Sequence, residues 1–103
     1  MALDRVAVIG AGAWGTALAQ AAAIAGRDVV LVARDAAVIA EVNSRHSNSA
    51  HLGAQQLAPG ITAAPELPDA DIVILAVPAQ SSRAALTRFA AGLHGKPVVL
   101  TAK

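Results

Sequence analysis

The 103-residue sequence predicts an α/β fold built on a doubly wound parallel sheet. Apolar runs of strand length alternate with segments of helical spacing, the order typical of a parallel sheet with helices on both faces. A glycine-rich turn at residues 10–15 follows the first of these runs. Hydrophobic residues make up 55% of the chain, which excludes disorder on composition. We therefore expect one compact α/β domain over residues 1–103.

The first strand is expected at residues 5–9, because this continuous apolar run is suited to burial on both faces of a sheet. A helix over residues 12–25 follows, and Gly26 is well placed just after its C-terminus. Alanine dominates this helix, so small side chains allow it to approach the sheet closely. The stripe expected to face the sheet consists of Ala17, Leu18 and Ala21.

A second strand is expected at residues 28–33, which are rich in Val and Leu. Asp35 can then act as the N-cap of a helix over residues 36–42, where apolar residues recur at helical spacing. Residues 43–60 are polar and irregular, and we expect a long loop there. A loop of this length in a compact domain is more often functional than a simple connection.

The second half of the chain repeats the alternation. A short strand is expected at residues 61–63 and a strongly apolar one at 71–77, which Pro78 ends. A helix capped by Ser81 or Ser82 should run to about residue 91, and a last strand should occupy residues 98–101. The apolar face of that helix is expected to comprise Leu86, Phe89, Ala90 and Leu93.

The glycine-rich turn reads G-x-G-x-x-G, with Gly10, Gly12 and Gly15 at the fixed positions. In such turns the first glycine permits a tight strand-to-helix turn and the second lets the backbone approach a pyrophosphate. The third allows close packing of helix on strand. The helix N-terminus then presents N–H groups and partial positive charge to phosphates. Because a strand precedes the turn and a second strand returns within a unit of about 30 residues, the pattern predicts dinucleotide binding.

Arg34 and Asp35 stand where the second strand ends, the position that distinguishes the two nicotinamide dinucleotides. An acidic residue there binds the ribose 2′-hydroxyl of NAD, whereas Arg accommodates the 2′-phosphate of NADP. Since neighbouring side chains diverge at a strand end, only one is expected to face the ribose. Asp35 has a role as helix cap, so Arg34 is the better ribose-phosphate candidate. The pattern favours NADP(H), while NAD(H) remains compatible with it.

Two further segments follow strands at the same edge of the predicted sheet. Val77-Pro78-Ala79-Gln80 should line the crevice near the nicotinamide half, because ligands of open α/β sheets bind beyond the carboxyl ends of the strands. A proline that only terminates the strand is an equal alternative on local grounds. Lys103 also lies beyond a strand end, although position alone does not distinguish it from a solvated terminal lysine.

Several functions are disfavoured by composition. The chain has no cysteine, His46 and His51 lack a carboxylate at metal-ligand spacing, and His94 lies in a predicted turn, so no metal site is expected. The charge of +1 without a basic stripe, with one Trp and one Phe, argues against nucleic-acid binding. No apolar run reaches the roughly 18 residues of a membrane span. A soluble, cytoplasmic protein is therefore expected.

The chain resembles the cofactor-binding region of bacterial-type NAD(P)-dependent glycerol-3-phosphate dehydrogenase, with the Rossmann-like fold of that family. The similarity covers the whole chain and rests on these segments: residues 8–19 (VIGAGAWGTALA), 30–35 (VLVARD), Arg45, Asn48 and Leu52 of the polar loop, Ala70-Asp71, residues 76–80 (AVPAQ), and Leu100-Thr101-Ala102-Lys103. It implies reduction of dihydroxyacetone phosphate to sn-glycerol 3-phosphate, which supplies phospholipid synthesis.

The resemblance also assigns residues to roles. Ala13 and Trp14 would lie in the cofactor turn, and Ala13 stands where many family members carry Ser. Arg34 would lie at the adenosine ribose, and His51 where family members commonly have an aromatic residue at the cofactor. Pro78 would lie in the turn that reads V-P-S-Q in the family and V-P-A-Q at residues 77–80 here. Lys103 would contact both cofactor and substrate.

In the family, a helical C-terminal domain supplies the rest of the substrate pocket and a lysine for proton transfer. The sequence stops just after the last predicted strand, so we expect a domain that binds cofactor without turnover, and a homodimer in the full-length protein. Two alternatives are a ketopantoate reductase-like NADP oxidoreductase and a non-catalytic dinucleotide sensor. Ketopantoate reductase-like proteins usually carry a lysine near the end of the fourth strand, where this chain has Pro78. Dinucleotide sensors normally end with a helix that covers their last strand.

Overall fold

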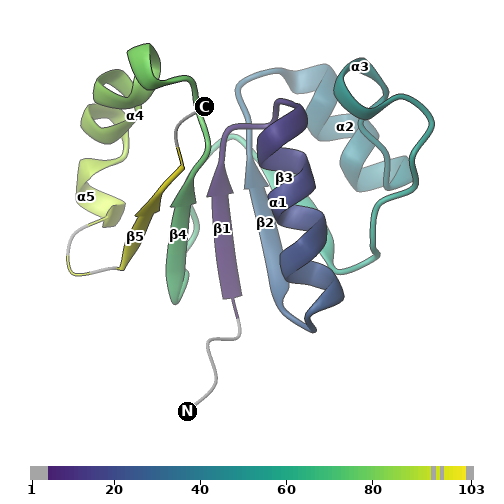
Figure 1. Cartoon of the computed structure of the whole chain (residues 1–103), viewed down its shortest axis with the longest axis horizontal. Coiled ribbons are helices and arrows are strands. Elements are labelled where there is room, and N and C mark those ends of the chain that lie inside the picture. The colour runs from purple at the N-terminus through teal and green to yellow at the C-terminus, as the bar shows by residue number, and fades with distance from the viewer. Residues whose placement is uncertain (1–4, 94, 96, 102–103) are drawn as a thin grey trace.

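The computed structural model describes residues 5–93, 95 and 97–101. Its centre is a five-stranded parallel sheet of order β3-β2-β1-β4-β5, with the strands running upward in Figure 1. The strands are β1 (Arg5–Ile9), β2 (Asp28–Val32), β3 (Ile61–Ala64), β4 (Ile72–Leu75) and β5 (Val98–Leu100). The helices are α1 (Ala13–Ile24), α2 (Ala36–Arg45), α3 (Ser49–Leu52), α4 (Ser82–Arg88) and α5 (Ala90–Leu93), with a 3-10 turn at Ala79–Ser81.

The predicted doubly wound sheet is confirmed by how β1 divides its side chains between the two faces. Val6 and Val8 pack in one core cluster with residues of α1 and α2, whereas Ala7 and Ile9 pack in a second cluster with Phe89. Alternation of side chains along a strand places these two clusters on opposite faces of the sheet. Because both clusters are apolar, the central strand is apolar throughout, as a parallel sheet requires.

The chain reverses its direction of sheet growth after β3. From β1 the strands are added on one side as β2 and β3, and then β4 pairs with the other side of β1. This creates a topological switch point between β1 and β4, which is where open α/β sheets form their ligand crevices. The glycine-rich turn leaves β1 at this point, so the fold brings the sequence motif to the crevice.

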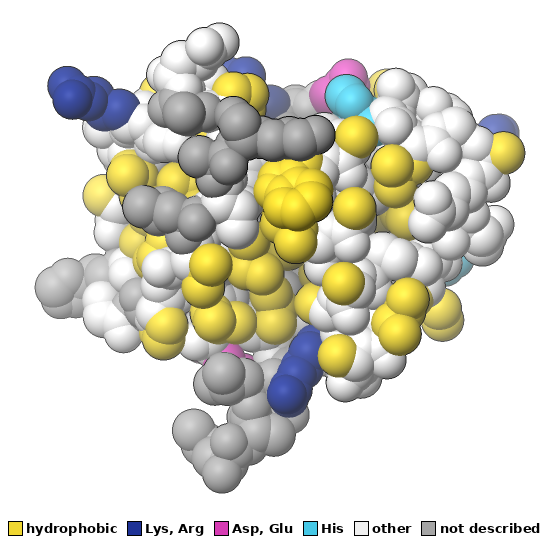
Figure 2. Space-filling model, viewed as in Figure 1, with side chains coloured by type: hydrophobic (Ala, Val, Ile, Leu, Met, Phe, Trp, Pro, Cys, Tyr) yellow, Lys and Arg dark blue, Asp and Glu magenta, His cyan; other side chains and the backbone are white. Residues whose placement is uncertain are grey.

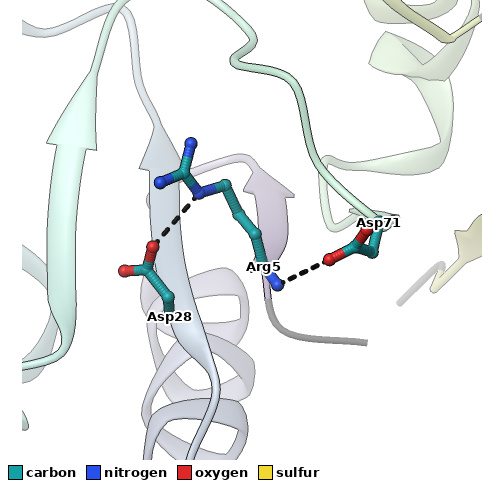
Figure 3. Close-up of polar contacts among 3 residues, drawn as sticks. All are labelled: Arg5, Asp28 and Asp71. Atoms are coloured by element: carbon teal, nitrogen blue, oxygen red, sulfur yellow. Dashed lines mark hydrogen bonds and ion pairs between the residues drawn. The ribbon is translucent and has the colours of Figure 1, made fainter. Parts of the chain in front are cut away.

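Arg5, Asp28 and Asp71 connect the strands at their amino ends, opposite the glycine-rich turn (Figure 3). The Arg5 backbone N–H donates to Asp71 Oδ2 at 2.9 Å, and its Nε donates to Asp28 Oδ2 at 3.1 Å. Asp28 is the register partner of Arg5 in β2, and the Asp71 N–H bonds back to the Arg5 carbonyl. These contacts join the beginnings of β2 and β4 to β1, away from the glycine-rich turn.

The face of α1 that contacts the sheet differs from the predicted stripe. Of the three predicted residues, Leu18 packs against the core, whereas Ala17 and Ala21 are exposed. The buried residues of α1 are Gly15, Thr16 and Ala19. Small apolar residues occur on every side of this helix, so its hydrophobic periodicity does not distinguish one face from another. The close approach of Gly15 to the preceding turn selects the buried face instead.

Other element boundaries also differ from prediction. The helix expected to residue 91 divides into α4 and α5, because Phe89 leaves helical geometry at the C-cap and is buried in the core. Leu86 and Ala90 are consequently exposed rather than packed. Helix α2 continues to Arg45, three residues beyond its predicted end, and the predicted loop contains α3. Strand β4 is shorter than predicted at both ends.

One part of the sheet has an apolar surface beside α1. Ile72 and Ile74 are half-buried, and Val99, the register neighbour of Ile74 in β5, is exposed. Figure 2 shows hydrophobic side chains gathered there, over β4 and β5. No helix of the described segments is long and apolar enough to cross a membrane.

Candidate dinucleotide-binding site

A cleft of about 440 Å³ lies at the carboxyl ends of β1, β2 and β4. Its walls come from the turns that follow these strands, together with His51 of α3 and the inner side of α4. The residues that line it are Ile9, Gly10, Ala11, Gly12, Val32, Ala33, Arg34, Asp35, Val38, His51, Ala76, Val77, Pro78, Ser81, Ala84, Ala85, Arg88 and Phe89. The cleft therefore brings together most of the residues that the sequence marked as a site.

Gly10 is required by the backbone itself. Its φ of +113° lies in a region that side chains disfavour, and an added Cβ would lie 2.6 Å from the Ala76 carbonyl oxygen. The Gly10 N–H donates to the Val32 carbonyl at 3.0 Å, and the Ala76 N–H donates to the Ile9 carbonyl at 2.8 Å. The tight turn predicted for the first glycine is thus fixed by contacts with β2 and with the residue after β4.

Gly15 is required by packing. A Cβ at this position would overlap the Gly10 carbonyl, so the first turn of α1 could not lie against the glycine-rich turn. This confirms the close packing of helix and strand that the third glycine predicts. Gly10 and Gly15 therefore serve the fold, with or without a ligand.

Gly12 is required neither by its backbone conformation nor by packing. Its φ of −73° and ψ of −173° suit any residue, and a Cβ there would meet no heavy atom within 4 Å. It also lines the cleft and occupies the N-cap position of α1 without a side chain to cap it. The first N–H groups of a helix have no intrahelical acceptor, so the bare backbone at Gly12 leaves room for an anion to reach them.

Arg34 and Asp35 both line the cleft. Their hydrogen bonds distinguish them. Asp35 Oδ1 accepts the Ala37 N–H at 2.9 Å, which confirms its predicted role as the N-cap of α2. Arg34 is exposed beside it and lies in the wall of the cleft. Its guanidinium is suited to bind a phosphate group there.

The other predicted residues divide into three groups. His51 and Pro78 line the cleft, from α3 and from the turn after β4. Ala13 and Trp14 are exposed in the first turn of α1, beside the cleft-lining turn but outside the cleft wall itself. Lys103 and His94 lie outside the described residues.

Arg88 and Phe89 belong to the cleft although the sequence did not mark them as site residues. The Arg88 guanidinium carbon lies 4.9 Å from the centre of the Phe89 ring, and Arg88 Nη2 donates to the Pro65 carbonyl at 3.3 Å. These residues were assigned only to a helix face. The signal that could have found them is topological, because the helix that follows β4 at the switch point borders the cleft along its length.

The segment that carries α3 is held to α2 by one carboxylate. Glu41 accepts hydrogen bonds from the Ser47 hydroxyl at 2.6 Å, the Ser49 N–H at 2.8 Å and the Ser49 hydroxyl at 2.9 Å. The hydrogen bond from Ser47, followed by that from the Ser49 backbone, holds the pKa of Glu41 below its usual range. These bonds restrain the segment that places His51 in the cleft.

Within the described part of the chain, no group of three or more His, Cys, Asp or Glu residues is arranged to hold a metal ion. What the cleft offers is a bare glycine backbone at the start of a helix and a guanidinium at the end of β2. The strand order and the position of this cleft are those of a Rossmann-type α/β domain.

Comparison with known proteins identifies the family. The family model of the N-terminus of NAD-dependent glycerol-3-phosphate dehydrogenase matches residues 5–103, and the chain belongs to this family. Among curated relatives, glycerol-3-phosphate dehydrogenase (NAD(P)+) of Caulobacter vibrioides is 49% identical over 107 residues, covering 100% of this chain and 32% of that protein. The corresponding protein of Parvibaculum lavamentivorans is 47% identical with the same coverage. The chain thus spans about a third of the length of these relatives.

Solved structures support the fold. Glycerol-3-phosphate dehydrogenase of Coxiella burnetii superposes with a TM-score of 0.85 at 24% identity, over 97% of this chain and 32% of that one. A probable 2-dehydropantoate 2-reductase of Bacillus subtilis superposes with a TM-score of 0.73 at 16% identity, over 96% of this chain and 33% of that one. The sheet is therefore common to both enzyme classes, and the family match rather than the fold separates them.

Proposed function

We propose that this chain is the cofactor-binding part of an NAD(P)-dependent sn-glycerol-3-phosphate dehydrogenase and that its cleft binds NAD(P)H. The observation that carries the proposal is Gly12, a glycine that neither backbone conformation nor packing explains. Close approach of a ligand to the backbone is a physical reason for a glycine at that position. The family to which the chain belongs is named for NAD-dependent glycerol-3-phosphate dehydrogenase, which agrees with a dinucleotide there.

The residues of the cleft suit each part of the dinucleotide. The backbone N–H groups around Gly12 and the N-terminus of α1 would receive the pyrophosphate. Arg34 would hold the adenosine ribose and its 2′-phosphate, which favours NADPH. Pro78 would border the nicotinamide half, and His51 would border the cofactor from α3. Trp14 and Ala13 would flank the pyrophosphate from the first turn of α1.

The proposed reaction is the reduction of dihydroxyacetone phosphate to sn-glycerol 3-phosphate, for phospholipid synthesis in the cytoplasm. The bound dinucleotide supplies the hydride, and a proton completes the alcohol. We assign Lys103 to contact with cofactor and substrate, because its ammonium group suits a phosphorylated substrate that carries a reacting oxygen. The complete enzyme would act as a homodimer.

Cofactor titration tests the binding proposal directly. Trp14 is the only tryptophan of the chain and lies two residues after Gly12, so its fluorescence should report ligand near the glycine-rich turn. Titration with NADPH and NADH should quench this fluorescence saturably, with NADPH binding more tightly, and calorimetry should give the same dissociation constants. If neither dinucleotide binds at millimolar concentration, the proposal is wrong.

The activity requires a separate test. NADPH oxidation would be followed in the complete gene product, with dihydroxyacetone phosphate and with ketopantoate as substrates. Oxidation with dihydroxyacetone phosphate alone is the expected result. Oxidation only with ketopantoate would assign the chain to the other enzyme class, and dinucleotide binding without turnover of either substrate would indicate a sensor.

A further inference from the structure

Asn48 is a buried side chain that connects the α3 segment to the glycine-rich turn. It is fully buried, as is Thr16, and these are the buried polar residues of the described chain. Asn48 Nδ2 donates to the Ala11 carbonyl at 2.9 Å and to Thr16 Oγ1 at 2.9 Å, and Thr16 Oγ1 donates to the same carbonyl at 3.3 Å. The Ala11 carbonyl is thus held by two side chains, one of them from a segment 37 residues away.

The chemistry of the acceptor fixes the orientation of this amide. A carbonyl oxygen only accepts hydrogen bonds, so the NH₂ group of Asn48 must face Ala11. The amide oxygen is then buried, with no partner among the described residues. Such an oxygen is unfavourable in a core, and an aliphatic side chain of similar size would avoid it. The interaction that an aliphatic residue could not provide is the pair of N–H donors directed at Ala11 and Thr16.

Holding the Ala11 carbonyl also determines where the next N–H points. The C=O and N–H of one trans peptide unit lie in a plane and point in opposite directions. Because the Ala11 carbonyl points toward Asn48 and Thr16, the N–H of Gly12 points away from them. Gly12 lines the cleft, and its N–H donates to none of the described residues.

We propose that Asn48 is a positioning residue that aims the Gly12 N–H at the pyrophosphate of the bound dinucleotide. The inference rests on the proposed function, since it assigns a ligand to the Gly12 N–H. Asn48 itself would not touch the cofactor. The Ser47 hydroxyl and the Ser49 N–H both donate to Glu41, so the residues on each side of Asn48 are held to α2 while the Asn48 side chain reaches the turn.

The test compares Asn48→Ala with Asn43→Ala. Asn43 is a matched control because its amide also makes two hydrogen bonds to distant groups, donating to the Ala63 carbonyl at 2.9 Å and accepting the Ala63 N–H at 2.7 Å. Asn43 connects α2 to β3 and is not among the residues that line the cleft. Each variant would be titrated with NADPH and with adenosine 2′-monophosphate, which carries the ribose phosphate but no pyrophosphate.

Asn48→Ala should weaken NADPH binding by about tenfold or more, as expected for a misdirected hydrogen bond to a charged group, and leave adenosine 2′-monophosphate binding unchanged. Asn43→Ala should leave both dissociation constants unchanged. Three results would each overturn the inference. Asn48→Ala could weaken the binding of NADPH and of adenosine 2′-monophosphate equally, it could leave NADPH affinity unchanged, or Asn43→Ala could weaken NADPH binding as much as Asn48→Ala does. Wild-type protein that binds no NADPH would instead contradict the proposed function.

A second variant keeps the test decisive if Asn48→Ala does not fold. Thr16→Val has nearly the same volume and removes the hydroxyl that also holds the Ala11 carbonyl. It should show the same selectivity, with weaker NADPH binding and unchanged adenosine 2′-monophosphate binding, but a smaller effect because the Asn48 bond to Ala11 remains. Wild-type NADPH affinity in a folded Thr16→Val variant would count against the proposed positioning.

Discussion

The substitution Gly12→Ala should separate binding from folding in this protein. The added Cβ would meet no protein atom within 4 Å, and the backbone at residue 12 is one that alanine readily adopts. If the bare backbone at this position serves a ligand, the methyl group should stand between the pyrophosphate and the N–H groups at the start of α1. Gly12→Ala should therefore fold and bind dinucleotide poorly.

The expected change in stability is small because two effects offset each other. Alanine is a poorer N-cap than glycine by about 0.5–1 kcal/mol. Replacing glycine at a permissive position restricts the unfolded chain and stabilises by about 0.4–1 kcal/mol. The net change should lie within about 1 kcal/mol, or less than about 4–8 °C in Tm for a domain of this size. Gly15→Ala, by contrast, should unfold the domain or destabilise it severely, because its Cβ would overlap the Gly10 carbonyl.

The expected change in affinity is large. A hydrogen bond to a charged group contributes about 1.5–3 kcal/mol, so losing one such contact weakens binding by about 10- to 150-fold. Gly60→Ala is the matched control, because Gly60 also has a permissive backbone and only ordinary contact with its surroundings, 3.5 Å to the Arg27 carbonyl oxygen. It lies outside the cleft lining. Tm would be measured by circular dichroism and NADPH affinity by Trp14 fluorescence.

One outcome refutes the reasoning outright. If Gly12→Ala binds NADPH with the affinity of the wild type and of Gly60→Ala, the cleft does not receive a pyrophosphate at Gly12. A large fall in Tm for Gly12→Ala would show that packing, not a ligand, requires this glycine. Reduced affinity with unchanged Tm supports the proposed site.

Three further predictions concern single side chains. Arg34→Ala should weaken NADPH binding by about tenfold or more and NADH binding much less, since only NADPH carries the 2′-phosphate; equal losses in titration would remove that role. Because hydrogen bonds from Ser47 and Ser49 hold the pKa of Glu41 below its ordinary value of 4.5, the stability they contribute is present above pH 4.5 and falls as pH drops through the lowered pKa. Thermal melts of Glu41→Gln should accordingly lose less stability than wild type between neutral and strongly acidic pH, and parallel curves would contradict this. Asp28→Asn should lower the free energy of unfolding by less than about 1 kcal/mol, since the ion pair of Asp28 with Arg5 is about half exposed. A larger loss, measured by urea unfolding, would contradict this prediction.

Local sequence pattern was sufficient for the five strands, for the helices α1 and α2, and for the glycine-rich turn between β1 and α1. The strand at residues 5–9 was predicted with its observed bounds, because an unbroken apolar run bounded by glycine has few other structures available. The Asp35 cap and the place of Gly26 just after the C-terminus of α1 were also predicted correctly, since both depend on a few neighbouring residues. Such features are fixed by short-range sterics and hydrogen bonding.

The predictions that were wrong depended on distant contacts. Alanine on every side of α1 hid its buried face, which is chosen by the contact of Gly15 with Gly10. The break at Phe89 depends on its burial against the sheet. Asn48 was noted only as part of a family resemblance, and nothing in the local pattern indicates that it would be fully buried against Ala11.

The sequence by itself determined the order of strands and helices, the glycine-rich turn and the family to which the chain belongs, because these depend on local pattern and on specific residues such as Trp14 within that turn. It also placed Arg34 at the end of a strand. Only the tertiary structure decided that a Cβ at Gly12 would meet no protein atom, unlike one at Gly10 or Gly15, and that Asn48 reaches the Ala11 carbonyl. The physical reason is that both depend on distances between residues far apart in the chain, which appear only when the sheet brings β1, β2 and β4 together.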